Sequence, residues 1–159
     1  MAGEVIRAAS GKHTRRAELE GVRQVSLAAL IMLVVQYGLG IILNLYIAVP
    51  ASDAHAGLTQ EIANGPLMLT LHAVLGLALI GAALVLLVRA VRLEDQVTAV
   101  LAAAGLTAIG GAFASGEIFV RNGQSGASLA MALLTGVALL CYIGALTRVS
   151  VALRRRSPG

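Results

Sequence analysis

The stretch PLMLTLHAVLGLALIGAALVLLV, at positions 66–88, decides the class of this protein, because it contains no Asp, Glu, Lys or Arg. At a rise of about 1.5 Å per residue, roughly 20 apolar residues are enough for a helix to cross the hydrocarbon of a bilayer. Pro66 suits the first position of such a helix, where no backbone donor is needed. The stretch therefore predicts a membrane-spanning helix.

Three further apolar blocks extend the same interpretation to residues 25–49, 97–116 and 125–147. The chain is 58% apolar and 13% charged, against about 45–50% and about 25% for a soluble domain. Short connections at 89–95 and 117–123 force neighbouring helices to run in opposite directions. We therefore predict an all-α fold, an integral membrane antiparallel four-helix bundle over residues 24–148, with a polar tail at 1–23 and a basic tail at 149–159.

The basic residues are distributed unevenly along the chain. Of the 12 Lys and Arg, all but Arg121 lie in the N-terminal tail, the connection at 89–95 or the C-terminal segment from Arg148. An excess of basic residues marks the cytoplasmic face of a membrane protein, so both termini are expected to be cytoplasmic. Because these residues flank apolar blocks, no nucleic-acid partner is expected. Ala54-His55-Ala56 has the form of a signal-peptidase site, but the preceding block is too long for a signal peptide.

Small residues indicate where the helices would pack. The chain contains 18 glycines, and small side chains allow helix backbones to approach each other in a membrane. The expected contact faces pair Ala73 with Gly76, Gly111 with Ser115, Ala112 with Gly116, and Gly136 with Gly144.

His72 is the main candidate for a functional residue, because an ionisable side chain inside a span is rare and faces the bundle interior. Gly40, the pair Gly110-Gly111 and Met131 are expected at a similar depth, which suggests a cavity beside the imidazole. Met131, or Met68 one turn from His72, would supply a thioether, and His with Met is a known axial pair for haem. A structural alternative stays open, in which a neutral His72 is hydrogen-bonded to Asn44 or to a backbone carbonyl.

Other polar residues fall within or near the spans. Gln36 and Asn44 lie near one face of the first helix, and amides there most often join helices by hydrogen bonds. Ser115 lies near the outer end of the third span. Glu117 follows it, four residues before Arg121, and an ion pair on the surface is the expected role.

Enzymatic chemistry has no support in the sequence. No nucleophile, dinucleotide-binding or phosphate-binding motif is present. Asp53, His55 and Glu61 do not match a zinc-binding spacing, and the single cysteine, Cys141, excludes an internal disulfide.

Three short stretches carry a resemblance: Asn44-Leu45-Tyr46 before Pro50, Leu71-His72-Ala73 with Leu75-Gly76-Leu77, and residues 128–133 followed by Cys141-Tyr142. Together they resemble a group of small, uncharacterised four-span membrane proteins of high-GC bacteria. The resemblance implies a bacterial plasma membrane and no particular activity.

Three functions are compatible with these observations. The first is an accessory or structural membrane subunit that packs against a protein partner or a second copy of itself. The second is a membrane protein that binds haem, a quinone or a similar apolar cofactor around His72. The third is a small transporter, although the first span lacks the glutamate that small multidrug transporters carry there.

Overall fold

The computed structural model describes residues 1–46, 67–122 and 124–155. Side chains are described for Met1 and from Thr14 onward, except those of Asn44 and Tyr46. Four α-helices make up this part of the chain: α1 (Ala2–Tyr46), α3 (Leu67–Arg92), α4 (Gln96–Asn122) and α5 (Ser125–Arg154). Each of them is long and apolar enough to cross a membrane.

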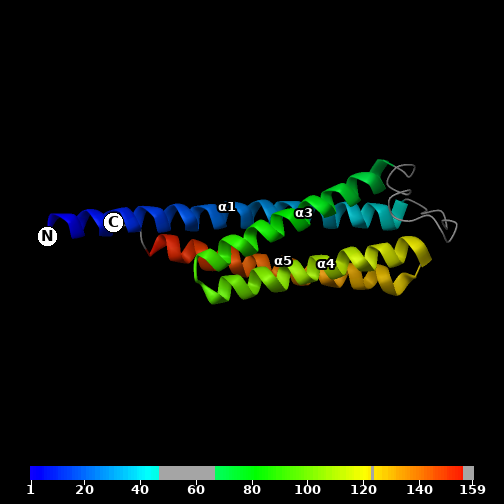
Figure 1. The fold of residues 1–159 in the computed structure, drawn as a ribbon. Helices are drawn as coiled ribbons and strands as arrows, with labels where there is room; N and C mark the ends of the chain where they lie inside the picture. The colour runs from blue at the N-terminus through cyan, green and yellow to red at the C-terminus, as the bar shows by residue number, and fades with distance from the viewer. Residues whose placement is uncertain (47–66, 123, 156–159) are drawn as a thin grey trace.

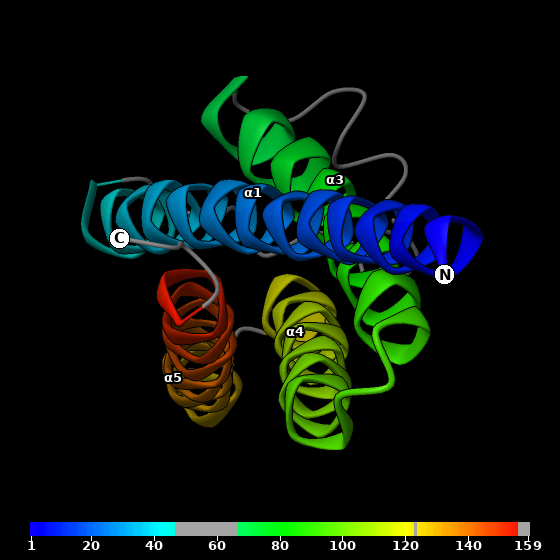
Figure 2. The same ribbon diagram turned by 90° about the vertical axis from the view of Figure 1, so that its left-hand side faces the viewer.

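The four helices form one bundle in which each contacts two neighbours. Helix α1 packs against α3 and α5, and α4 packs against the same two helices. Figures 1 and 2 show α4 and α5 lying side by side, while α3 crosses α1 at a steep angle. The most extensive contact joins α4 and α5. The bundle has two ends, which we name the Arg92 end, where the turn between α3 and α4 lies, and the Tyr46 end, where α5 begins.

The interior follows a regular spacing on all four helices. Buried positions alternate at intervals of three and four residues, as in α1 at Leu19, Val22, Ser26, Ala29 and Leu33. This is the heptad spacing that keeps one seam of a helix facing its neighbours in a bundle. The equivalent seams are Gly76, Leu79, Ala83, Leu86 and Ala90 in α3, Thr98, Ala102, Gly105, Ile109 and Ala112 in α4, and Thr135, Ala138, Tyr142, Ala145 and Val149 in α5.

Most seam residues are small, so a few large side chains fill the interior. Tyr142 is the largest fully buried side chain among the described residues. Its ring lies directly against Gly105, where an added Cβ would overlap the ring atoms. Because a β-carbon at this position has no room, Gly105 allows α4 and α5 to pack as closely as they do.

The N-terminal segment is helical, and although most of its described side chains are exposed, two of them reach the bundle interior. Helix α1 begins at Ala2, and Leu19 and Val22 belong to the same buried cluster as Leu93 and Val149. The reason is that the seam of α1 continues beyond the apolar block, with Leu19 and Val22 at the next heptad positions. The bundle interior therefore extends into the charged part of the chain.

Two other local expectations are corrected. The turn expected from Glu117 does not begin there, because α4 continues to Asn122. Glu117 and Arg121 lie one helical turn apart and form an ion pair of 2.7 Å on the helix surface, so this polar segment suits a helix. Gly136 does not make its expected helix contact, since an added Cβ there would meet nothing within 4 Å of the described atoms.

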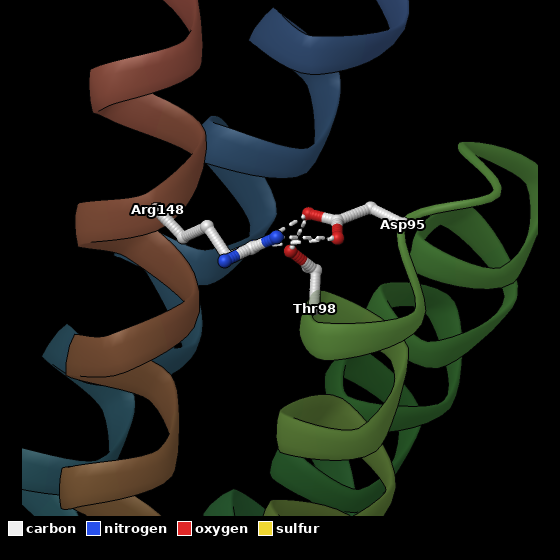
Figure 3. A network of polar contacts seen from close by, with 3 residues as sticks. All are labelled: Asp95, Thr98 and Arg148. Carbon is white, nitrogen blue, oxygen red and sulfur yellow. Dashed lines mark hydrogen bonds and ion pairs between the residues drawn. The ribbon is translucent and has the colours of Figure 1, made fainter.

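A polar network at the Arg92 end connects the α3–α4 turn to α5 (Figure 3). The Arg148 guanidinium donates to both carboxylate oxygens of Asp95, with Nε 3.0 Å from Oδ2, and the Thr98 hydroxyl donates to Oδ2 at 2.7 Å. The preceding residue, Glu94, has a φ of 56°, a left-handed conformation that ends α3. The network thus holds the α3–α4 turn against α5, although Arg148 lies 53 residues after Asp95 in the sequence.

The close contact at Gly105 generates a prediction for stability. Replacing Gly105 with Ala should lower the free energy of unfolding by about 1–3 kcal/mol, the usual cost of overpacking. Gly110→Ala is the matched control on the same helix, because an added Cβ there meets nothing within 4 Å. Unfolding of both variants in mixed detergent measures the difference. Equal stabilities would contradict the packing of Tyr142 against Gly105.

The network at the Arg92 end predicts a dependence on pH. The hydrogen bond from Arg148 lowers the pKa of Asp95, assisted by the bond from Thr98 and opposed by partial burial. A carboxyl with a lowered pKa stabilises the folded state above its ordinary pKa of about 4, and this contribution is lost as the pH falls through the lowered value. The unfolding midpoint should therefore fall in strong acid. Asp95→Asn should have a lower midpoint at neutral pH and a smaller change with acid; a change equal to that of the original protein would contradict this role.

Candidate functional site

A cavity of about 200 Å³ lies between the four helices, toward the Tyr46 end of the bundle. Each helix contributes to its wall: Gln36 and Gly40 from α1, His72 and Gly76 from α3, Gly116 and Glu117 from α4, and Met131 and Thr135 from α5. The rest of the lining is mainly apolar. His72 therefore faces the bundle interior, together with Met131.

The cavity exists because small residues coincide at this level on three helices. An added Cβ on Gly40 would lie 3.4 Å from Cε1 of His72, and one on Gly116 would lie 3.3 Å from Sδ of Met131. His72 and Met131 thus pack against the backbones of α1 and α4. Nearer the Arg92 end, the ring of Tyr142 lies directly against Gly105, whereas the atoms that lie against Gly40 and Gly116 belong to the smaller side chains of His72 and Met131.

Large apolar side chains close the cavity on the side of the Arg92 end. Leu33, Leu79 and Ile109 line it there and are 1%, 2% and 5% exposed. They come from three different helices at equivalent seam positions. This layer separates the cavity from the rest of the interior.

The carboxamide of Gln36 joins α1 to α3 and defines the polar part of the wall. Its Nε2 donates to the backbone carbonyl of His72 at 2.9 Å. Gly76 makes this approach possible, because an added Cβ there would lie only 3.1 Å from Nε2. The carbonyl can only accept, so the amide orientation is fixed and Oε1 is directed elsewhere. Oε1 is buried and has no hydrogen-bond partner among the described residues.

The imidazole of His72 provides the second free polar atom. Nδ1 is buried and likewise has no partner in the described part of the chain. Buried polar atoms are normally hydrogen-bonded, and each exception calls for an explanation. Among the described residues four buried side-chain atoms lack a partner: Gln36 Oε1 and His72 Nδ1, whose residues line the cavity, and Ser26 Oγ and Tyr142 Oη, whose residues do not.

The remaining candidates are only partly brought together here. Met68 and Ser115 do not line the cavity. The hydroxyl of Ser115 instead donates to the Gly111 carbonyl of the same helix at 2.9 Å. Glu117 lines the cavity but pairs with Arg121. Gly110 is exposed, whereas an added Cβ on Gly111 would lie 3.0 Å from Leu134.

Some candidates lie outside the described residues. The side chain of Asn44 is among them, as are Asp53, His55 and Glu61 with the proposed outer loop. Within the described residues no group of three or more His, Cys, Asp and Glu side chains is placed to bind a metal ion.

The sequence did not reveal the roles of Gly76 and Thr135. Gly76 exposes the His72 carbonyl to Gln36, and Thr135 donates its hydroxyl to the Met131 carbonyl at 2.8 Å while lining the cavity. The available signal was the heptad spacing: Gln36 and Gly40 continue the seam of α1, and Met131 and Thr135 continue that of α5. Because most positions in these helices are apolar, hydrophobicity does not reveal this spacing. Only the polar and small residues indicate which positions face the interior.

Comparison with protein-family models, curated proteins and solved structures finds no match to the chain. The site must therefore be interpreted from its own chemistry.

The unpaired oxygen of Gln36 generates a prediction for stability. Because Oε1 lacks a partner, Gln36→Leu loses one hydrogen bond, worth roughly 1 kcal/mol or less between membrane helices, and also removes a buried unsatisfied group. The net change in unfolding free energy should be below about 1 kcal/mol. Leu33→Ala, in the adjacent packed layer, should cost about 2 kcal/mol or more. If Gln36→Leu costs as much as Leu33→Ala in detergent unfolding, Gln36 serves stability rather than a ligand.

Proposed function

We propose that the chain is a multi-pass protein of a bacterial plasma membrane, with its four helices in an antiparallel arrangement and both termini in the cytoplasm. The four long apolar helices support insertion into a bilayer. The basic residues support the orientation, since those of the α3–α4 turn and of the end of α5 share one end of the bundle (Figure 1).

Reporter fusions test this orientation. A reporter active only in the periplasm and a reporter active only in the cytoplasm are each fused at Glu61 and at Pro158. Each reporter should give opposite signals at the two positions, because the excess of basic residues places Pro158 but not Glu61 in the cytoplasm. Like signals would contradict the proposed topology.

The function that the site supports best is the binding of a small ring-shaped apolar molecule with polar substituents, of the kind found in the headgroup of a membrane quinone. The observation that carries this proposal is that two residues on the wall of an apolar cavity, Gln36 and His72, each have a buried polar atom without a partner among the described residues. Ligand sites typically combine an apolar lining with a few polar groups that orient the ligand. A membrane-dissolved ligand also suits a site lined by apolar helices and open on one side.

The cavity volume selects among the cofactors that the sequence suggested. A cavity of about 150 Å³ holds benzene, whereas drug-sized ligands occupy roughly 300–1,000 Å³. About 200 Å³ therefore suits a single substituted ring. A haem, with four pyrrole rings, exceeds it, although His72 and Met131 face the same space.

A transporter is less well supported. The packed layer of Leu33, Leu79 and Ile109 lies between the cavity and the Arg92 end, so the cavity has the form of a binding site rather than of a passage across the bundle.

Ligand binding can be tested by filling the cavity. A short-chain benzoquinone should raise the unfolding midpoint of the protein in lipid nanodiscs, because binding to the folded state stabilises it. Gly116→Leu, on the cavity wall, should abolish this rise, whereas Gly110→Leu, on the exposed face of the same helix, should not. No rise for the benzoquinone or its hydroquinone would contradict the proposal, and a Soret band in the purified protein would favour haem instead.

A second candidate is an accessory membrane subunit that packs against a protein partner or another copy. Gly81 and Gly110 favour it, because both are exposed and an added Cβ on either meets nothing within 4 Å of the described atoms. Backbone exposed in this way suits close contact with another membrane helix. Gly110→Leu should then reduce the size of the assembly in native gels while leaving ligand binding unchanged; an unaltered assembly would contradict this candidate.

A further inference from the structure

The exposed residues of the cavity wall show where the cavity opens. Tyr37 and Ile41 of α1 line the cavity and are 42% and 44% exposed, whereas the other lining residues are buried or half-buried. They are four residues apart and therefore neighbours on one face of the helix. Both lie in the part of α1 that is apolar enough to cross a membrane. A residue that borders a cavity and is also exposed lies at the edge of an opening, so the opening is beside Tyr37 and Ile41.

The contacts of α1 place this opening on its side toward α5. Gln36 and Gly40 lie against His72 of α3. Successive residues of a helix are turned by about 100°, so Tyr37 and Ile41 lie one such step around α1 from these contacts. The other neighbour of α1 is α5. Tyr37 and Ile41 therefore border the gap between α1 and α5.

Helix α5 presents small residues to the same gap. Met131 lies against Gly116 of α4, and Ala132, which also lines the cavity, is turned by about 100° from it, away from α4 and toward α1. Gly136 lies one turn further along, and an added Cβ there would meet nothing within 4 Å of the described atoms. In Figure 1 the start of α5 lies farther from the line of α1 than its end does. The gap is therefore lined by apolar and small residues.

The other sides of the cavity are less suited to an apolar group. Between α3 and α4, the ring of Phe113 reaches the position of Gly76, where an added Cβ would lie 4.0 Å from Cδ2. Glu117 lines the wall of α4 and carries an ion pair with Arg121, and a hydrocarbon chain beside charged groups would remove them from water at a cost. Only the gap between α1 and α5 thus offers an apolar path from the described part of the cavity to the lipid.

Resting on the ligand-binding role proposed above, we infer that the ligand is an amphiphile. Its ring occupies the cavity, and a hydrocarbon chain attached to the ring leaves between α1 and α5, past Tyr37 and Ile41, into the bilayer. The cavity of about 200 Å³ has room for the ring alone, so the chain must lie outside it. Ala132 determines whether the chain is accepted, because a large side chain there would fill the gap.

The first experiment compares two probes in lipid nanodiscs: a trimethyl-benzoquinone and the same ring with a decyl chain. Their affinities are expressed per mole fraction in the bilayer, which removes the difference in partitioning. The two affinities should agree within about threefold, because the chain has similar apolar surroundings in the lipid and beside the helices. A cavity without an opening for the chain would exclude the second probe.

Photolabelling locates the chain. A diazirine near the ring end of the decyl chain should label α1 around Tyr37 and α5 around Ala132, as read by mass spectrometry of the peptides. The chain also labels lipid-facing surfaces from the bilayer. Labelling at the site is therefore defined as the part that an excess of the chain-free ring suppresses.

Two variants assign the opening to Ala132. Ala132→Trp should weaken binding of the chain-bearing probe by about tenfold or more, because the chain would overpack the filled gap, and should change binding of the chain-free ring by less than about threefold. Leu140→Trp is the matched control on the same helix, since Leu140 is 72% exposed and does not line the cavity. It should bind both probes as the original protein does.

The possible results separate the two proposals. If neither probe binds, the ligand-binding role itself is wrong. If only the chain-free ring binds, or if the suppressible labelling falls on α3 or α4, the ring site stands and the inferred path of the chain is overturned. An equal loss of both probes in Ala132→Trp would overturn the role of Ala132. Labelling of the original protein decides the path even if this variant fails to fold.

Discussion

Close approach of four helix backbones is the constraint on which this structure depends. In an apolar surrounding, water does not drive the helices together, so contact and hydrogen bonding must do so. The seams accordingly contain many small residues, and Gly105 meets the ring of Tyr142 directly. Toward the Tyr46 end, Gly40 lies against His72 and Gly116 against Met131, and a cavity remains between the helices there.

The same constraint explains why polar residues occur in this interior. Gln36 reaches the His72 carbonyl only because Gly76 leaves room for its amide. Its amide oxygen, Oε1, then has no partner among the described residues. The amide therefore gains one hydrogen bond between α1 and α3 and leaves one buried acceptor unsatisfied, which costs free energy. The same reasoning applies to Nδ1 of His72, and both residues line the cavity.

The two ends of the bundle have different chemistry and so different consequences. At the Arg92 end, Asp95 accepts hydrogen bonds from the exposed Arg148 and from the buried Thr98 (Figure 3), and these bonds hold a turn in place. Toward the Tyr46 end, the polar atoms of Gln36 and His72 are buried and lack partners among the described residues. Ser26 Oγ and Tyr142 Oη are also unpartnered among the described residues, but they lie in the packed part of the interior, so only Gln36 and His72 combine an unpaired atom with a place on the cavity wall.

The sequence by itself determined that the chain forms four long apolar helices and that His72 and Gln36 are exceptional within them, because composition and length set these features locally. It also predicted from their four-residue spacing that Glu117 pairs with Arg121, although it placed both residues in a turn and the structure places them in α4. Only the tertiary structure decided that Met131 shares a cavity with His72 while Met68 does not, and that the helix of Leu19 and Val22 continues the bundle. These outcomes depend on which seam of each helix faces its neighbours. In a chain where nearly every face is apolar, hydrophobicity does not distinguish the seams, and packing between small and large residues selects them.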